Sequence, residues 1–106
     1  MEKQVFQEIG QYSPDRYVHV PVFEGERTKV ILLCLSAGLS VPPHSHPGFE
    51  ITLQPLCGKA VLPTGEGNEM VLKPGEIYFF ADGAKTFNPK NPFSEPFQML
   101  IHLVKK

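Results

Sequence analysis

Several features are scarce or missing in this chain of 106 residues. The only cysteines, Cys34 and Cys57, do not form a Cys-x-x-Cys pair, which indicates buried free thiols in a reducing compartment. The formal net charge is -1, with no block of like charges, so composition favours neither a nucleic acid nor a membrane surface as partner. No apolar run suits a signal peptide or a membrane helix. We therefore expect a cytoplasmic protein whose partner is a small molecule or another copy of itself.

Segments long enough for helices are also missing, because eleven prolines and nine glycines divide the chain into short pieces rich in Val, Ile, Leu and Phe. This pattern predicts an all-β protein with no helix, and a chain of this length forms one domain. The sequence between residues 64 and 68, Thr-Gly-Glu-Gly-Asn, predicts a hairpin loop. The expected strands are Tyr17–Phe23, Lys29–Ser36, Val41–His46, Phe49–Gln54, Lys59–Leu62, Glu69–Leu72, Ile77–Phe80, Thr86–Asn88 and Phe97–Val104.

One predicted strand is apolar at every position rather than at alternate ones. The run from Val30 to Leu35 contains no polar side chain, which is typical of a strand covered on both faces. A two-layered sheet or a dimer interface supplies such cover. We expect residues 1–29 to form an N-terminal arm and the first strands, and residues 30–104 to form a barrel, within one domain that spans residues 1–106.

The residues between 38 and 50 carry the clearest functional signal. His44 and His46 are separated by one residue, followed by Glu50. Side chains alternate across a strand, so two histidines at even spacing project the same way, about 7 Å apart along the chain. Two imidazoles and a carboxylate form a common ligand set for a divalent transition metal. The pattern predicts a metal site or a polar ligand site.

These residues resemble the first sequence motif of the cupin superfamily. In that motif, a glycine is followed after five residues by His-x-His, then by a glutamate and by a second glycine. Gly38, His44 and His46 match it residue for residue. Counting forward from the histidines puts the glutamate at Glu50, whereas counting back from Gly58 puts it at Ile51. Because neighbouring strand residues face opposite sides, the sequence leaves open which of these two positions faces the barrel interior.

The second cupin motif is present in part. Gly75 and Gly83 match, but the proline, histidine and asparagine of the motif are replaced by Ala81, Thr86 and Lys90. The resemblance covers about residues 30 to 104. It implies a single-domain cupin β-barrel, also described as a double-stranded β-helix or jelly roll, and a homodimer.

The resemblance also implies a site inside the barrel. His44, His46 and Glu50 are the expected ligands of Fe, Mn, Ni, Co or Zn, while Thr86 at the fourth place is a poor substitute for an imidazole. His19 is expected to be structural, and His102 is a further candidate ligand on the last strand. The pocket around the metal is expected to comprise Phe49, Ile51, Leu53, Tyr78, Phe80, Thr86, Met99 and His102.

Three classes of function follow. The chain is a metal-dependent oxygenase or isomerase acting on a small organic molecule, a metal-free module that binds a small ligand in the same pocket, or a structural protein whose barrel is filled. Cupins host many chemistries on one scaffold, so the sequence leaves both the substrate and enzymatic activity open.

Overall fold

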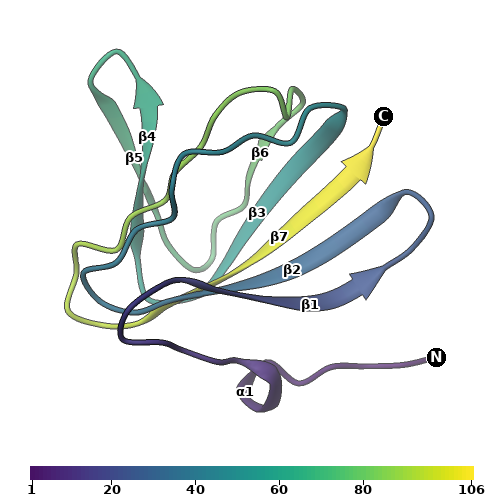
Figure 1. Cartoon of the computed structure of the whole chain (residues 1–106), viewed down its shortest axis with the longest axis horizontal. Helices are drawn as coiled ribbons and strands as arrows, with labels where there is room; N and C mark the ends of the chain where they lie inside the picture. The colour runs from purple at the N-terminus through teal and green to yellow at the C-terminus, as the bar shows by residue number, and fades with distance from the viewer.

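The computed structural model describes residues 1–106. Its regular secondary structure consists of antiparallel strands and one short helix. In chain order the elements are α1 (Phe6–Ile9), β1 (Val18–Glu24), β2 (Thr28–Leu35), β3 (Phe49–Cys57), β4 (Ala60–Gly65), β5 (Asn68–Leu72), β6 (Tyr78–Phe80) and β7 (Phe97–Lys105). Five strands form one sheet in the order β1-β2-β7-β3-β6, and the β4–β5 hairpin faces it (Figure 1). The all-β prediction is confirmed.

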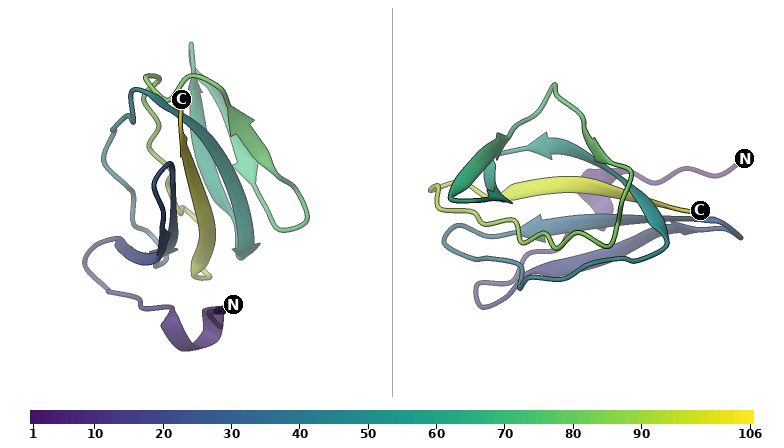
Figure 2. Two further views of the ribbon diagram at one scale, coloured as in Figure 1. Left: turned by 90° about the vertical axis from the view of Figure 1, so that its right-hand side faces the viewer. Right: turned by 90° about the horizontal axis from the view of Figure 1, so that it is seen from above.

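Two predicted strands do not form as regular strands. Residues 41–46 and 86–88 pair only through the isolated bridge between His44 and Phe87. Next to them, Ser40 bridges to Lys90, which bridges in turn to Val61 of β4. Prolines at positions 42, 43, 47 and 89 interrupt these segments, and each proline removes a ladder donor. The two segments nevertheless lie beside β4 and complete the second layer of the barrel (Figure 2).

The main core fills the space between the two layers. It comprises Leu33, Leu35, Val41, Ile51, Leu53, Ala60, Leu62, Leu72, Phe87, Phe97, Met99, Ile101 and Leu103. Along β2, β3 and β7 the members of this cluster alternate with residues that point the other way, as the pleat of a strand requires. We call the side of the large sheet that faces the core the inner face, and the opposite side the outer face.

A second, smaller cluster lies on the outer face. Leu32, Cys34 and Leu100 are buried there, and Phe6 and Ile9 of α1 pack against them. The prediction that the Val30–Leu35 run is covered on both sides is confirmed for its last four residues. The prediction of no helix is wrong, because no proline or glycine interrupts residues 1–9 and one helical turn packs the partly buried Phe6 and Ile9 against this cluster. Cys34 is a buried free thiol as expected, but Cys57 is exposed.

A buried asparagine orders the loop that precedes β7. The Asn91 side-chain amide donates hydrogen bonds to the carbonyl oxygens of Leu35 (3.0 Å) and Glu95 (2.9 Å). Its side-chain oxygen accepts one from the backbone N–H of Phe93 (3.1 Å). These bonds satisfy a polar side chain inside the protein, so Asn91 fixes the proline-rich segment that leads from the second layer back to the large sheet.

Candidate functional site

Backbone hydrogen bonds hold the two histidines, which we call the histidine pair, in the second layer. The His44 N–H donates to the Phe87 carbonyl oxygen (3.2 Å), and the Phe87 N–H donates to that of His44 (2.9 Å). The His46 N–H donates to the Gly83 carbonyl oxygen (2.7 Å). A Cβ atom on Gly83 would clash with the carbonyl oxygens of His46 and Phe49, so close backbone packing requires this glycine of the second motif.

The rings of the histidine pair lie close together. Their centroids are 5.1 Å apart and the ring planes meet nearly edge to face. Two imidazoles on one tetrahedral ion have centroids about 5.2 Å apart, given a metal–nitrogen distance of about 2.0–2.1 Å. The Nδ1 atom of His44 lies 2.9 Å from the Pro42 carbonyl oxygen, so in the neutral ring Nδ1–H donates and Nε2 keeps the free lone pair. The pair can therefore supply two ligands.

The expected third ligand is on the wrong side of its strand. Glu50 is exposed and pairs with Val104, whereas Ile51 is buried in the core between Leu103 and Phe80. The register of β3 with β7 is unbroken through these residues, and its only shift lies between Pro55 and Cys57. Ile51 therefore faces the interior, and the structure does not bring the Glu50 carboxylate to the histidine pair.

Phe87 occupies the position opposite the pair that the motif count had given to Thr86. Residues directly opposite in an antiparallel pair point to the same side, and Phe87 bridges to His44. The Phe87 ring centroid lies 4.4 Å from that of His44, 6.0 Å from that of His46 and 5.7 Å from that of Phe80. Phe87 is buried, while the neighbouring Thr86 is exposed.

Most of the other predicted pocket residues line no cavity. Ile51, Leu53 and Met99 are fully packed core residues, with half-buried Phe49 and Tyr78 against them. The Tyr78 hydroxyl contacts residues that precede it in the chain. It accepts a hydrogen bond from the Lys73 N–H (3.3 Å), and it contacts Glu76 and the Val71 carbonyl oxygen. Partial burial and the bond to Glu76 raise the pKa of Tyr78.

His102 is not a candidate ligand in this fold. It pairs with Val30 and Thr52, while its neighbours Ile101 and Leu103 belong to the core. Its side chain therefore lies on the outer face, away from the barrel interior. Alternate residues of the last strand do face the interior, as expected. These residues are Phe97, Met99, Ile101 and Leu103, and His102 lies between two of them.

A transition metal held only by protein side chains does not fit these residues. No three His, Cys, Asp or Glu side chains lie together in an arrangement that could hold a metal ion. His44 and His46 supply two imidazoles, but the residues that face the interior in place of Glu50 and Thr86 are Ile51 and Phe87, whose side chains are hydrocarbon. Hydrocarbon side chains have no donor atom, so the histidine pair has no third protein ligand.

The residues near the histidine pair are basic; the sequence analysis expected a structural role for His19 and did not consider Lys29. His19 and Lys29 lie opposite Leu33 and Leu103 in the sheet register, which places both on the inner face. The His19 side chain keeps an exposed edge, but surrounding protein and the neighbouring His44 and His46 lower the pKa of His19. Burial, His44 and Lys29 lower the pKa of His46. The only sequence signal that could have placed His19 and Lys29 on the inner face is the alternation of inward and outward residues along the first two strands.

A cleft lies next to Phe87. Its volume is about 700 Å³, and Leu62, Phe80 and Phe87 supply its apolar surface. Two of the predicted pocket residues, Phe80 and Thr86, therefore do line a cavity. The remaining lining residues come from both sides of the barrel mouth and are Pro43, Pro63, Thr64, Gly65, Lys85 and Asn88. Lys85 is the only charged residue among them.

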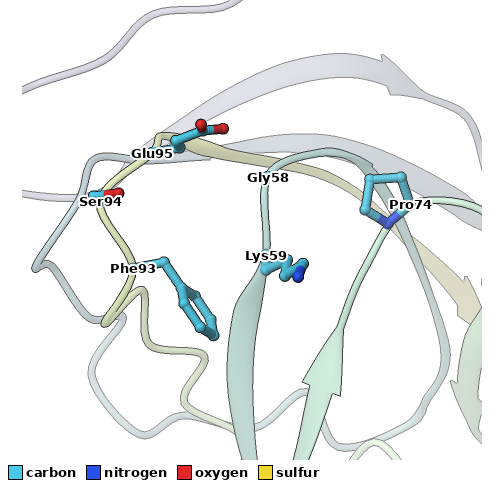
Figure 3. A pocket seen from close by; sticks show the side chains of 6 residues that line it. All are labelled: Gly58, Lys59, Pro74, Phe93, Ser94 and Glu95. Carbon is cyan, nitrogen blue, oxygen red and sulfur yellow. The ribbon is translucent and has the colours of Figure 1, made fainter.

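A second hollow lies at the opposite end of β4. It has a volume of about 400 Å³, and Phe93 is its only large apolar side chain. Figure 3 shows the Phe93 ring projecting from the loop that precedes β7 toward the start of β4. The walls carry both signs of charge, Lys59 and Glu95. The hollow therefore lacks both the apolar floor and the single charge of the cleft over Phe87.

Solved structures with the same architecture identify the fold. The chain superposes on TT1209 from Thermus thermophilus with a TM-score of 0.88 and 28% identity, covering 99% of this chain and 98% of that chain. A double-stranded β-helix protein from Klebsiella pneumoniae gives a TM-score of 0.87, at 22% identity over 97% of this chain and 84% of the other. A predicted oxalate decarboxylase from Thermotoga maritima gives 0.74, at 19% identity over 85% and 81%.

The chain thus has the cupin fold, as its sequence motifs predicted. No protein-family model matches the sequence, and no curated protein matches it significantly. No helix of the structure is long and apolar enough to cross a membrane.

Proposed function

We propose that this protein binds a small organic anion in the cleft over Phe80 and Phe87, without a metal ion held by the protein. The cleft carries the proposal, because it combines an aromatic floor with one cationic side chain, Lys85. Small-molecule sites are commonly cavities of about 300–1,000 Å³ with apolar walls and a few polar groups. The volume of about 700 Å³ lies in this range.

The chemistry of the lining residues selects the class of ligand. The Phe80 and Phe87 rings favour a flat, apolar body, while the Lys85 ammonium group favours a carboxylate or another anionic group. The hydroxyls of Thr64 and Thr86 and the amide of Asn88 add hydrogen-bonding groups at the rim. No carboxylate lines the cleft to repel an anion. The name of the Thermotoga maritima neighbour refers to a small dicarboxylate, which belongs to the same ligand class.

The metal-dependent alternative lacks its donors. An oxygenase or isomerase site would need ligands at the two interior positions where this chain has Ile51 and Phe87. Lys85 is also the only ionisable side chain that lines the cleft, so no acid–base pair is available there. We therefore propose binding rather than catalysis as the role of the cleft.

Titrations with benzoate and oxalate test the proposal, with benzamide as the neutral probe of matched shape. We expect benzoate to bind more tightly than benzamide, because only the carboxylate gains from Lys85. In Lys85→Gln the affinity for benzoate should fall about tenfold or more, since a hydrogen bond to a charged group contributes about 1.5–3 kcal/mol. Lys59→Gln is the matched control, because Lys59 lines the other hollow, and its affinity should be unchanged.

Two results would count against this function. If neither benzoate nor oxalate binds to the native protein or to Lys59→Gln, the proposed anion site is wrong. Elemental analysis offers a separate check: near-stoichiometric transition metal in the native protein that disappears in a His44→Ala, His46→Ala double variant would overturn the metal-free assignment.

A further inference from the structure

The segment between α1 and β1 encloses a further hollow, which we call the Arg16 hollow. Its volume is about 530 Å³, and it is lined by every residue from 11 to 19 except Pro14 and Asp15. Figure 1 shows the chain running away from α1 and doubling back into β1, so that this segment forms a loop at one end of the large sheet. The hollow shares no residue with the cleft over Phe80 and Phe87, and its volume is in the usual range of small-molecule sites.

The polar groups of the Arg16 hollow are all able to donate hydrogen bonds. They are the guanidinium of Arg16, the imidazole of His19, the hydroxyls of Tyr12, Ser13 and Tyr17, and the amide of Gln11. Asp15, the only carboxylate between residues 11 and 19, does not line the hollow. His44 and His46, whose charges act on His19, are basic as well. These surroundings favour an anionic ligand.

The protein leaves two of these donors free. The Asp15 N–H donates a hydrogen bond to Ser13 Oγ (3.2 Å), so the Ser13 hydroxyl keeps its own proton for another acceptor. The Arg16 guanidinium takes part in none of the side-chain hydrogen bonds of the chain. By contrast Arg27, the only other arginine, donates to the Lys105 carbonyl oxygen (3.0 Å). A ligand in the hollow therefore gains hydrogen bonds without breaking any within the protein.

The loop around the hollow is fixed by contacts with the rest of the barrel. The Ser36 hydroxyl donates to the Ser13 carbonyl oxygen (2.7 Å), which ties the loop to the residue that follows β2. Tyr17 packs against the main core, and its ring centroid lies 5.0 Å from that of His19. His19 itself belongs to β1 and pairs with Leu33. Because binding groups on a fixed framework lose less conformational entropy when a ligand arrives, these contacts favour binding.

We propose that the Arg16 hollow binds the phosphoryl group of an organic phosphate monoester. A guanidinium donates two parallel hydrogen bonds to an anion, which already occupy both oxygens of a carboxylate. A phosphoryl group has three acceptor oxygens and a charge of about -1.5 to -2 at pH 7. Its third oxygen leaves an acceptor for His19 and the Ser13 hydroxyl, and its greater charge suits the basic surroundings. The rings of Tyr12 and Tyr17 supply apolar surface for the organic part.

Calorimetric titration with phenyl phosphate tests the proposal in the Lys85→Gln background, in which the cleft over Phe80 and Phe87 has lost its only charge. In this background Arg16→Gln should raise the dissociation constant of phenyl phosphate about tenfold or more, because hydrogen bonds between charged groups are lost. Arg27→Gln removes an equal charge outside the hollow and should leave the constant unchanged. Inorganic phosphate should bind less tightly than phenyl phosphate, since it has no ring to contact Tyr12 and Tyr17. Equal affinities would overturn the assignment to a monoester in favour of free phosphate.

Further readouts locate the site. In nuclear magnetic resonance spectra of Lys85→Gln, phenyl phosphate should shift the backbone amide signals of residues 11–19. Circular dichroism and benzoate binding of the single variant Arg16→Gln should match those of the native chain, since Arg16 is exposed and lies outside the cleft. A Lys85→Gln protein that does not bind phenyl phosphate, an affinity unchanged by Arg16→Gln, or signal shifts confined to other residues would overturn the proposal. None of these results depends on whether benzoate binds in the cleft.

Discussion

At the scale of single residues, Ile51 and Phe87 distinguish this barrel from one built to hold a metal. Both side chains face the interior in place of Glu50 and Thr86, and both are buried hydrocarbon. The Phe87 ring also contacts His44 and lines the cleft, so one side chain belongs to the surroundings of both.

Replacing Phe87 with histidine should create a metal site. The Phe87 centroid lies 4.4 Å from His44 and 6.0 Å from His46, so an imidazole there would complete a set of three ligands with an open fourth position. We expect Phe87→His to bind Co²⁺ or Zn²⁺ at one ion per chain, as followed by the visible spectrum of the Co²⁺ form. Phe87→Leu, which removes the ring without adding a donor, should bind none. A folded Phe87→His protein without metal would show that the rings cannot converge.

At the scale of elements, the β4–β5 hairpin illustrates how local sequence determines local structure. The loop predicted at residues 64–68 is present, and the pairing of Gly65 with Asn68 leaves Glu66 and Gly67 as a two-residue turn. Both have positive φ, 56° and 79°, as in a type I′ turn. Glu66 is the only non-glycine residue with positive φ in the chain, a conformation that costs an L-residue about 1–2 kcal/mol.

Substitution at this turn should stabilise the protein. Asn-Gly is a preferred pair for type I′ turns, because asparagine tolerates positive φ. We therefore expect Glu66→Asn to raise the free energy of unfolding by about 0.5–1 kcal/mol, measured by urea denaturation. Glu66→Ala removes the same charge but keeps the unfavourable backbone conformation, so it should give no gain. Equal stabilisation by both variants would assign the effect to charge instead.

At the scale of the whole molecule, the histidines near the barrel mouth link stability to pH. His19 comes from β1, and His44 and His46 from the second layer, so folding alone brings these imidazoles and Lys29 together. Folding lowers the pKa of both His19 and His46. A group with a lowered basic pKa takes up its proton more readily in the unfolded chain, so acid favours unfolding.

We expect the free energy of unfolding to fall as the pH drops below about 6.5, the ordinary histidine pKa, and the histidine contribution to level off below the lowered pKa values. Above that pH both states bind no proton at these rings and the contribution vanishes. Urea denaturation across this pH range should show that the free energy of unfolding depends less steeply on pH in His46→Gln than in the native chain. Identical pH dependence in the two proteins would contradict the proposed histidine interaction.

The sequence by itself determined the class of fold, because the spacing of prolines and glycines and the alternation of apolar residues are local properties. It also predicted the hairpin loop, the apolar β2 run and the histidine pair. Tertiary structure decided which phase of each alternation faces inward. Glu50 and Ile51 differ by one residue, and the pairing of β3 with β7, a strand distant along the chain, selects Ile51. Similarly, Phe87 rather than Thr86 faces the histidine pair because of a long-range bridge to His44, which no local pattern encodes.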